Sequence, residues 1–231
     1  RKPNPSAFCK HIVDPVNIWK DPGKREENLI GKGGFGRVYK GIYTSVDKNS
    51  SPPKKTFHEV AVKYVPYVDK TAVSLLKEIN FMRRMSISRH HLPFYKCFYE
   101  LAKDRQNKED KRPQIILMMA LMKGDTDAMV KNQKKRNEML NTLKWQTFMV
   151  DMAKGIRDMH WMGVLHRDIK LDNFLINKYN NPIVADLGLS EFVADGVSGL
   201  AGTPYYLAPE VLVKGTKYGL PVDVYSLGVT F

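Results

Sequence analysis

Two short clusters in the chain carry side chains that suit phosphate and a divalent cation. The first is the run HRDIKLDN over residues 166–173, and the second is the tripeptide DLG that begins at Asp186, thirteen residues after Asn173. Carboxylates such as Asp168 and Asp186 and the amide of Asn173 offer the oxygen ligands that Mg²⁺ prefers, and Lys170 can neutralise phosphate charge. The pattern indicates chemistry in which a nucleoside triphosphate and Mg²⁺ are held over an incoming hydroxyl group.

A glycine-rich segment lies far upstream, with the sequence GKGGFG over residues 31–36. Glycines at these positions let the backbone approach phosphate oxygens that a side chain would block. A dinucleotide-binding Rossmann turn is the rival interpretation, but it requires a helix directly after the last glycine. Here the sequence VYKGIY over residues 38–43 favours a strand. We therefore expect the segment to join two strands and fold over a nucleotide.

These segments, in this order, resemble eukaryotic protein kinases of the serine/threonine type over residues 25 to 231. The resemblance implies ATP and Mg²⁺ as cofactors. Asp168 would accept or orient the proton of the substrate hydroxyl, and Lys170 would neutralise the transferring phosphoryl group. Asn173 and Asp186 would hold the metal.

A lysine and a glutamate are expected to pair. Lys63 closes the strand-like run VAVK over residues 60–63, and Glu78 shares a helical face with the apolar Leu75 and Ile79. A carboxylate among apolar neighbours is costly unless it meets a cation. The resemblance supplies that cation, because the strand lysine of the family binds the α- and β-phosphates and pairs with a glutamate on the next helix.

The segment GTPYYLAPE over residues 202–210 bears on the substrate. Thr203 matches a threonine that, in serine/threonine kinases, bonds to the catalytic aspartate and lysine; otherwise it would be a plain turn residue. Together with Lys170, it favours serine/threonine over tyrosine specificity. Arg167 matches a residue that pairs with a regulatory phosphate, and Ser198 is then the candidate target of an upstream kinase.

The resemblance also assigns residues around the nucleotide. They are Gly31, Lys32, Gly33, Gly34, Phe35 and Gly36 in the glycine-rich loop, Val38, Ala61 and Leu175 beside the adenine, Met119 to Leu121 as the hinge, and Asp125 at the ribose. For Asp125, a solvated loop position is the alternative.

The predicted strands and helices around these residues, together with the resemblance, indicate an α+β, bilobal protein-kinase-like fold. We expect an extended leader over residues 1–24, a small lobe with an antiparallel β-sheet and one helix over 25–121, and a mainly α-helical large lobe over 122–231. Strands are predicted on both sides of the glycine-rich turn, near Val60 to Val65, at Phe94 to Glu100 and at Gln114 to Leu121. An exposed loop is predicted from Thr44 to Thr56, and a mobile insert from Leu101 to Pro113.

In the second half, a stripe at near four-residue spacing predicts a long helix that ends near Gly163. The stripe consists of Phe148, Met152, Ile156 and Met159. A further helix is predicted to begin near Pro221. The sequence ends at Phe231 inside that helix, so the resemblance implies a C-terminally incomplete large lobe without the arginine that pairs with the residue matching Glu210 in the family.

Composition limits the other classes of function. The chain has 231 residues, a formal net charge of +13 and two cysteines. The longest apolar run, from Ile115 to Met122, is about half of what a membrane span needs, so no span is expected. The basic run from Lys131 to Arg136 lacks interleaved aromatic residues, so nucleic acid is not an expected partner. Two cysteines indicate neither a disulfide framework nor a metal quartet, which favours the cytoplasm or nucleus.

Two alternatives to a protein serine/threonine kinase in signalling stay open. A pseudokinase or scaffold would bind nucleotide and partners without efficient catalysis, although such proteins often lose a catalytic residue and none is lost here. A kinase-like enzyme acting on small molecules is disfavoured by the intact segment from Thr203 to Glu210, which in the family shapes a surface for a protein substrate.

Overall fold

The computed structural model describes residues 9–11, 26–33, 36–47, 49, 51–52, 54–68, 70–100, 113–135, 142–194 and 196–231. The chain divides into two compact units. The first contains Arg1–Ile79 and Phe94–Leu121, and the second contains Asn80–Pro93 and Met122–Phe231. None of the described helices is long and apolar enough to cross a lipid bilayer. The predicted insert from Leu101 to Pro113 lies outside the described residues except for Pro113.

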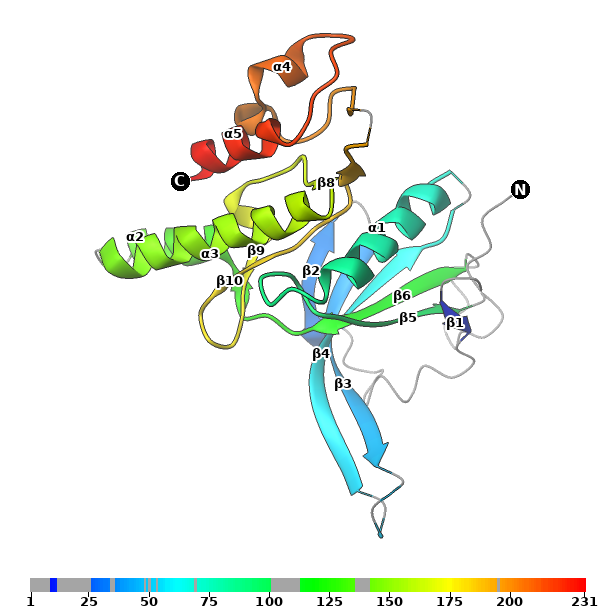
Figure 1. The fold of residues 1–231 in the computed structure, drawn as a ribbon. Coiled ribbons are helices and arrows are strands. Elements are labelled where there is room, and N and C mark those ends of the chain that lie inside the picture. The colour runs from blue at the N-terminus through cyan, green and yellow to red at the C-terminus, as the bar shows by residue number, and fades with distance from the viewer. Residues whose placement is uncertain are drawn as a thin grey trace. The chain divides into compact units, whose positions relative to one another are not determined.

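A six-stranded sheet forms the first unit, in the order β1-β5-β6-β4-β3-β2 (Figure 1). Its strands are β1 (Lys10–His11), β2 (Leu29–Gly33), β3 (Gly36–Asp47), β4 (Lys54–Pro66), β5 (Phe94–Glu100) and β6 (Gln114–Ala120). Strands β2 to β6 pair antiparallel with one another, and α1 (Ala72–Met85) begins in this unit. The α+β class with one helix beside a small antiparallel sheet is therefore confirmed.

Each face of the sheet carries its own apolar core, because side chains alternate along a strand. One face holds a buried cluster of Tyr39, Val60, Val62, Tyr64, Ile116 and Met118. The opposite face includes Ala61, Val65, Ile115 and Leu117, all less than 9% exposed, and Lys63 on this face contacts Glu78 of α1. This second face is where strand and helix meet.

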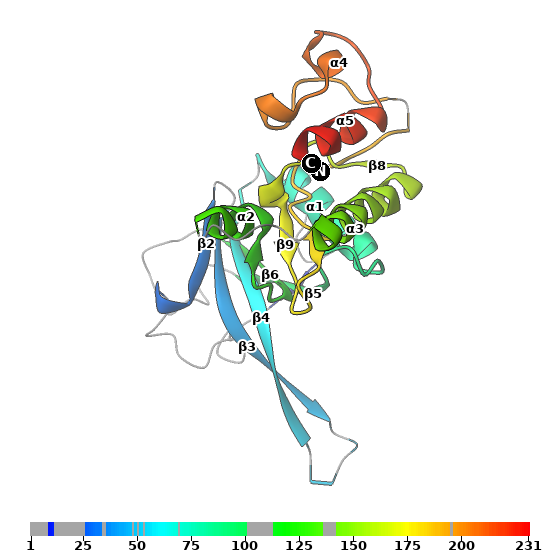
Figure 2. The ribbon, with the colours of Figure 1, turned by 90° about the vertical axis from the view of Figure 1, so that its left-hand side faces the viewer.

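The predicted loop from Thr44 to Thr56 is wrong. Strands β3 and β4 continue past the sheet as a two-stranded outer ribbon, which we define as residues 42–47 and 54–59 (Figure 2). Residues 54–59 are all exposed. Because residues 54–59 bury no face, this strand shows no alternation of apolar and polar residues that could be detected from the sequence.

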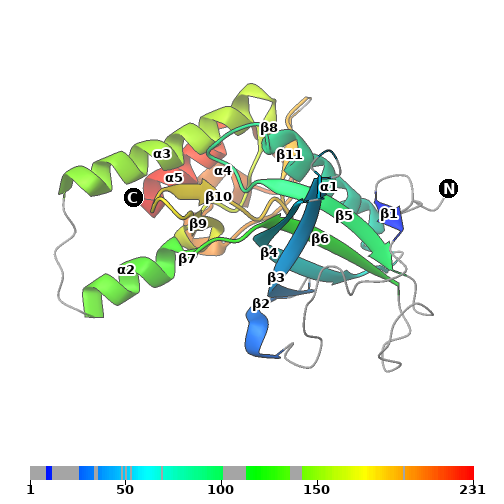
Figure 3. The same ribbon diagram turned by 90° about the horizontal axis from the view of Figure 1, so that it is seen from below.

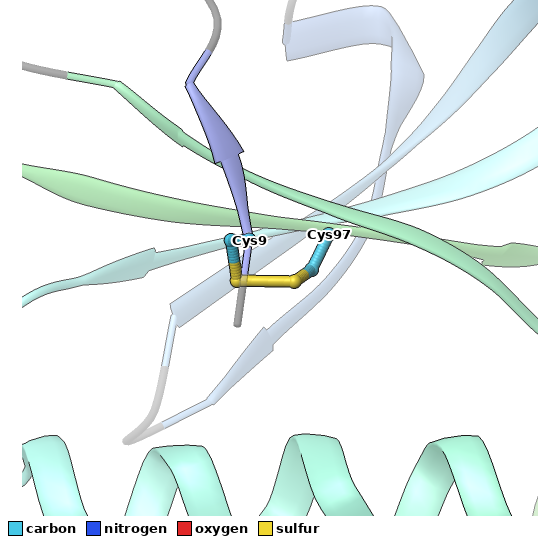
Figure 4. The surroundings of a disulfide bond; sticks show 2 residues. All are labelled: Cys9 and Cys97. Atoms are coloured by element: carbon cyan, nitrogen blue, oxygen red, sulfur yellow. A yellow bond between two sulfur atoms is a disulfide. The ribbon is translucent and has the colours of Figure 1, made fainter. Parts of the chain in front are cut away.

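Within the expected leader, Lys10 and His11 form β1 at the edge of the sheet (Figure 3). This strand runs parallel to β5, with Lys10 opposite Phe98 and His11 opposite Tyr99. The preceding residue, Cys9, is joined to Cys97 of β5 by a disulfide across 88 residues (Figure 4). This single bond was not foreseen from the sequence, in which two cysteines indicate no disulfide framework.

Helices dominate the second unit. They are α2 (Thr126–Lys135), α3 (Thr142–Trp161), α4 (Pro209–Leu212) and α5 (Pro221–Thr230). The strands β10 (Pro182–Val184), β9 (Phe174–Ile176) and β7 (Gly124–Asp125) form one small sheet, and β11 (Glu191–Phe192) pairs with β8 (Val164–Leu165) in another.

The long helix α3 confirms the predicted stripe. It buries all four predicted residues, Phe148, Met152, Ile156 and Met159. The helix ends two residues before Gly163, whose φ of 66° is a left-handed conformation that glycine adopts readily. Near the other end of the unit, α5 buries Val222 and Leu227 but leaves Val224 59% exposed.

Candidate active site

The candidate catalytic loop, residues 166–173, lies between β8 and β9, and a buried carboxylate on α5 fixes its start. Asp223 accepts hydrogen bonds from the backbone N–H of His166 at 2.8 Å and of Arg167 at 2.9 Å. His160 on α3 contacts the same carboxylate at 3.0 Å. Arg167 has a φ of 69°, which is costly for a residue other than glycine. Asp223 therefore fixes the backbone conformation directly before Asp168 and so positions that residue.

Asp168, Lys170 and Thr203 form one connected network. Thr203 Oγ1 donates to Asp168 Oδ1 at 2.6 Å, and Lys170 Nζ donates to Thr203 Oγ1 at 2.7 Å. Lys170 Nζ also lies 2.9 Å from Asp168 Oδ2. Partial burial alone would raise the pKa of Asp168, but the hydrogen bonds from Thr203 and Lys170 outweigh it and hold that pKa below its ordinary value. The carboxylate is thus ionised and fixed at neutral pH.

Asn173 and Asp186 are brought together by the backbone. The carbonyl of Asn173 accepts a hydrogen bond from the N–H of Ala185 at 2.9 Å, and Asp186 follows with a φ of 54°. The amide nitrogen of Asn173 donates to the carbonyl and the carboxylate of Asp168 at 2.7 and 2.9 Å. This orientation commits the nitrogen inward and leaves the amide oxygen for a cation. Asp186 is exposed, so its carboxylate is accessible.

Lys63 and Glu78 form the expected ion pair in the first unit, with Nζ and Oε1 2.9 Å apart. Their side chains are 18% and 9% exposed. Strand β4 delivers Lys63 to the sheet face that carries α1, and the helix presents Glu78 between its buried neighbours Leu75 and Ile79. The buried carboxylate of the helix thus has its cation.

The glycine-rich segment lies on two strands, as predicted. Gly31 and Gly33 belong to β2 and Gly36 begins β3, whereas Gly34 and Phe35 lie outside the described residues. Because β3 follows the last glycine directly, the helix that a Rossmann turn needs is absent from the described residues 36–47. A Cβ at Gly36 would clash with the carbonyl of Tyr64, and its φ is 142°, so only glycine fits.

Residues expected beside the adenine fall on neighbouring strands. Ala61 lies opposite Met119, and Val38 lies opposite Lys63. Ala61 and Met119 are each 6% exposed. Leu121 follows the end of β6 and is half-buried, and Lys32 in β2 is exposed.

Two further candidates belong to the second unit, where Asp125 in β7 lies opposite Leu175 in β9. Asp125 Oδ1 accepts the backbone N–H of Ala128 at 2.7 Å and thereby caps the N-terminus of α2. One oxygen of this carboxylate therefore has a structural partner, a detail that the sequence Asp-Thr-Asp at a helix start could have signalled. The ribose role of Asp125 stays a prediction.

The sequence reading missed several contacts. Arg167 Nε donates to the backbone carbonyl of Leu189 at 2.6 Å, which gives this arginine a partner other than phosphate. His90 contacts Asp158 of α3 at 3.0 Å, and His91 contacts the carbonyl of Gly155 at 2.9 Å. Only the adjacent histidines at 90 and 91 could have drawn attention to these links.

Comparison with known proteins agrees with this geometry. The family model described as the protein kinase domain matches residues 25–231. The chain is 28% identical over 206 residues to the cell division control protein 2 homolog D of Antirrhinum majus. The match covers 87% of this chain and 62% of that relative, so the chain spans less than two thirds of the relative's length.

Proposed function

The chain belongs to the protein kinase family, and we propose that it is a serine/threonine protein kinase that transfers the γ-phosphoryl group of ATP to a protein hydroxyl. The observation that carries the proposal is the network of Asp168, Lys170 and Thr203, whose three side chains lie within 2.6 to 2.9 Å of one another. Phosphoryl transfer depends mainly on positioning and charge neutralisation, which such a fixed network supplies.

Asp168 orients the substrate hydroxyl. Its lowered pKa makes it an acceptor that is ionised at neutral pH and a weak base, so it takes the proton as the hydroxyl oxygen forms its bond to phosphorus. Lys170 stabilises the negative charge of the phosphoryl oxygens, and ADP leaves with the electrons of the broken bond. The double link of Thr203 to both residues favours serine or threonine as acceptor, as the family resemblance implies.

The oxygen ligands of Asn173 and Asp186 fit Mg²⁺. This cation usually takes one or two protein carboxylates and completes its shell with phosphate oxygens and water. Bound there, it neutralises charge on the nucleotide phosphates. In the first unit, Lys63 would bind the α- and β-phosphates, with Glu78 holding its ammonium group in place. The assignments of Val38, Ala61, Met119, Leu121 and Leu175 to the adenine are part of this proposal.

We also propose a protein substrate, an upstream kinase acting at Ser198, and a place in the cytoplasm or nucleus. Ser198 is exposed and follows Val197, which exchanges two backbone hydrogen bonds with Tyr218. The relative's name refers to cell division control, which agrees with a signalling enzyme in those compartments. The disulfide between Cys9 and Cys97 is unusual there and points to redox chemistry.

The test is steady-state phosphorylation of a generic basic protein, combined with direct measurement of ATP binding. Asp168→Asn should lower turnover by roughly 10²- to 10⁴-fold with little change in ATP affinity. Asp186→Asn should abolish turnover and weaken Mg²⁺-dependent ATP binding. Asp172→Asn is the matched control, because this exposed aspartate in the same loop has no assigned role.

Unchanged turnover in either of the first two variants would remove the assigned role. Binding of ATP by the unaltered protein without any transfer would instead favour a pseudokinase or scaffold.

A further inference from the structure

The disulfide between Cys9 and Cys97 is buried at the edge of the sheet of the first unit. The Cα atoms are 4.9 Å apart, and the two residues are 5% and 4% exposed. The bond is followed at once by β1, whose two residues, Lys10 and His11, pair with β5. A strand of two residues is too short to hold its place by ladder hydrogen bonds alone. The covalent bond therefore anchors β1 to the sheet.

The register of the sheet places Cys97 in the same cross-strand row as Lys63. Cys97 lies directly opposite Leu117 of β6, and Leu117 lies directly opposite Lys63 of β4. Residues opposite one another in adjacent strands project from the same face of a sheet. Cys97, Leu117 and Lys63 thus form one row across β5, β6 and β4, and about 10 Å separates its two ends.

The face that carries this row is the one that α1 covers. Lys63 reaches Glu78 of α1 from it, and Leu117 is 0% exposed between the sheet and the rest of this core. Figure 4 shows the sulfur–sulfur bond on the side of the strands that faces α1. The disulfide and the ion pair of Lys63 with Glu78 therefore rest on the same layer of packed side chains.

We propose that the bond between Cys9 and Cys97 is a redox site whose reduction releases β1 and weakens ATP binding through the ion pair of Lys63 with Glu78. Loss of the anchor opens the core beside Leu117, and packing beneath α1 loosens because close-packed interiors transmit local changes. Glu78 then holds Lys63 less firmly. The nucleotide readout rests on the proposed function, whereas the release of β1 does not.

The chemistry is thiol–disulfide exchange with a dithiol as the reductant. A thiolate of the dithiol attacks the sulfur of Cys9, the bond between the protein sulfurs breaks, and Cys97 leaves as a thiolate that takes up a proton. The second thiol of the reductant then attacks the mixed disulfide. Cys9 is released as a thiol and the reductant becomes a cyclic disulfide. Access to the buried sulfur requires only that the short edge strand β1 fray.

The experiment compares the air-oxidised protein with the same protein treated with dithiothreitol. Thiols are counted under denaturing conditions, trypsin cleavage after Lys10 is followed by mass spectrometry of reduced samples, and the Kd of a fluorescent ATP analogue is measured. Reduction should add two thiols, speed cleavage after Lys10, and raise Kd roughly tenfold, which corresponds to about 1.4 kcal/mol. With or without dithiothreitol, Cys9→Ser should match the reduced protein in cleavage after Lys10 and in Kd.

Each of the opposite results would overturn a stated part of the proposal. Two free thiols in the air-oxidised protein would overturn the site, and equal Kd values in the two states would overturn its coupling to the nucleotide. If neither state binds the analogue, the proposed function fails. In that case faster cleavage after Lys10 on reduction would still support the redox anchor, and unchanged cleavage would refute it.

Discussion

The carboxylate of Asp223 offers the sharpest test of how the catalytic loop is held. This side chain is 1% exposed and accepts the backbone N–H groups of His166 at 2.8 Å and Arg167 at 2.9 Å. Asp223→Ala leaves both donors without their partner. Each such loss costs about 1–3 kcal/mol, so the free energy of unfolding should fall by about 2–6 kcal/mol. A typical domain has only about 5–15 kcal/mol in total.

Activity should fall further than stability alone explains. The left-handed conformation of Arg167 is held by the bond to Asp223, and relaxation of that backbone would displace Asp168 from Thr203. Urea unfolding at pH 7 measures the first effect, and turnover corrected for the folded fraction measures the second. Asp151→Ala is the matched control, because Asp151 on α3 forms a local ion pair with Lys154, three residues away, and should change stability by less than about 0.5 kcal/mol. A loss below about 1 kcal/mol with normal turnover in Asp223→Ala would refute the reasoning.

Three further outcomes are expected. Lys63→Met should weaken ATP binding, and Glu78→Gln should weaken it less. The double variant should bind ATP no more weakly than Lys63→Met, because one ion pair carries both effects. Additive losses in ATP affinity would contradict this. Burial lowers the pKa of His91 to about 4 from its ordinary 6.5, so the folded state favours the neutral ring. The protein should therefore lose up to about 3 kcal/mol of stability as the pH falls from 6.5 toward 4. His91→Gln, which can still donate to the carbonyl of Gly155, should flatten that pH dependence of urea unfolding, and an unchanged slope would exclude His91 as its source. If mass spectrometry shows that the unaltered protein is phosphorylated at Ser198, Ser198→Ala should have lower activity than that protein. Equal activity of the two would refute the switch.

The sequence predicted the elements that bury a face. The stripe from Phe148 to Met159 identified α3, and the apolar strands β5 and β6 were placed within one residue of their observed ends. A carboxylate on the apolar helix face predicted that Glu78 meets a cation, and the resemblance to protein kinases identified that cation as Lys63.

Other features left no local signal. In the outer ribbon, residues 54–59 of β4 are exposed throughout, so burial imposes no period on this strand. Cys9 and Cys97 meet only because the leader returns to the sheet edge, and a separation of 88 residues carries no spacing pattern. The partner of Arg167 is a backbone carbonyl at Leu189, which every residue type can offer. Contacts of this kind depend on the path of the chain and not on residue identity.

The outer ribbon and the sheet use different parts of the same two strands, β3 and β4. Within the sheet, β3 and β4 carry Val38 and Lys63, whose register is constrained by neighbours on both sides. Past residue 42 of β3 and before residue 59 of β4, the described strands pair only with each other. Tyr43 still packs against the core of the sheet, so a change in the length of this hairpin leaves the pairing within the sheet in place only if it lies beyond Tyr43. The exposed residues 54–56 of β4 are therefore a suitable place to attach a fluorophore.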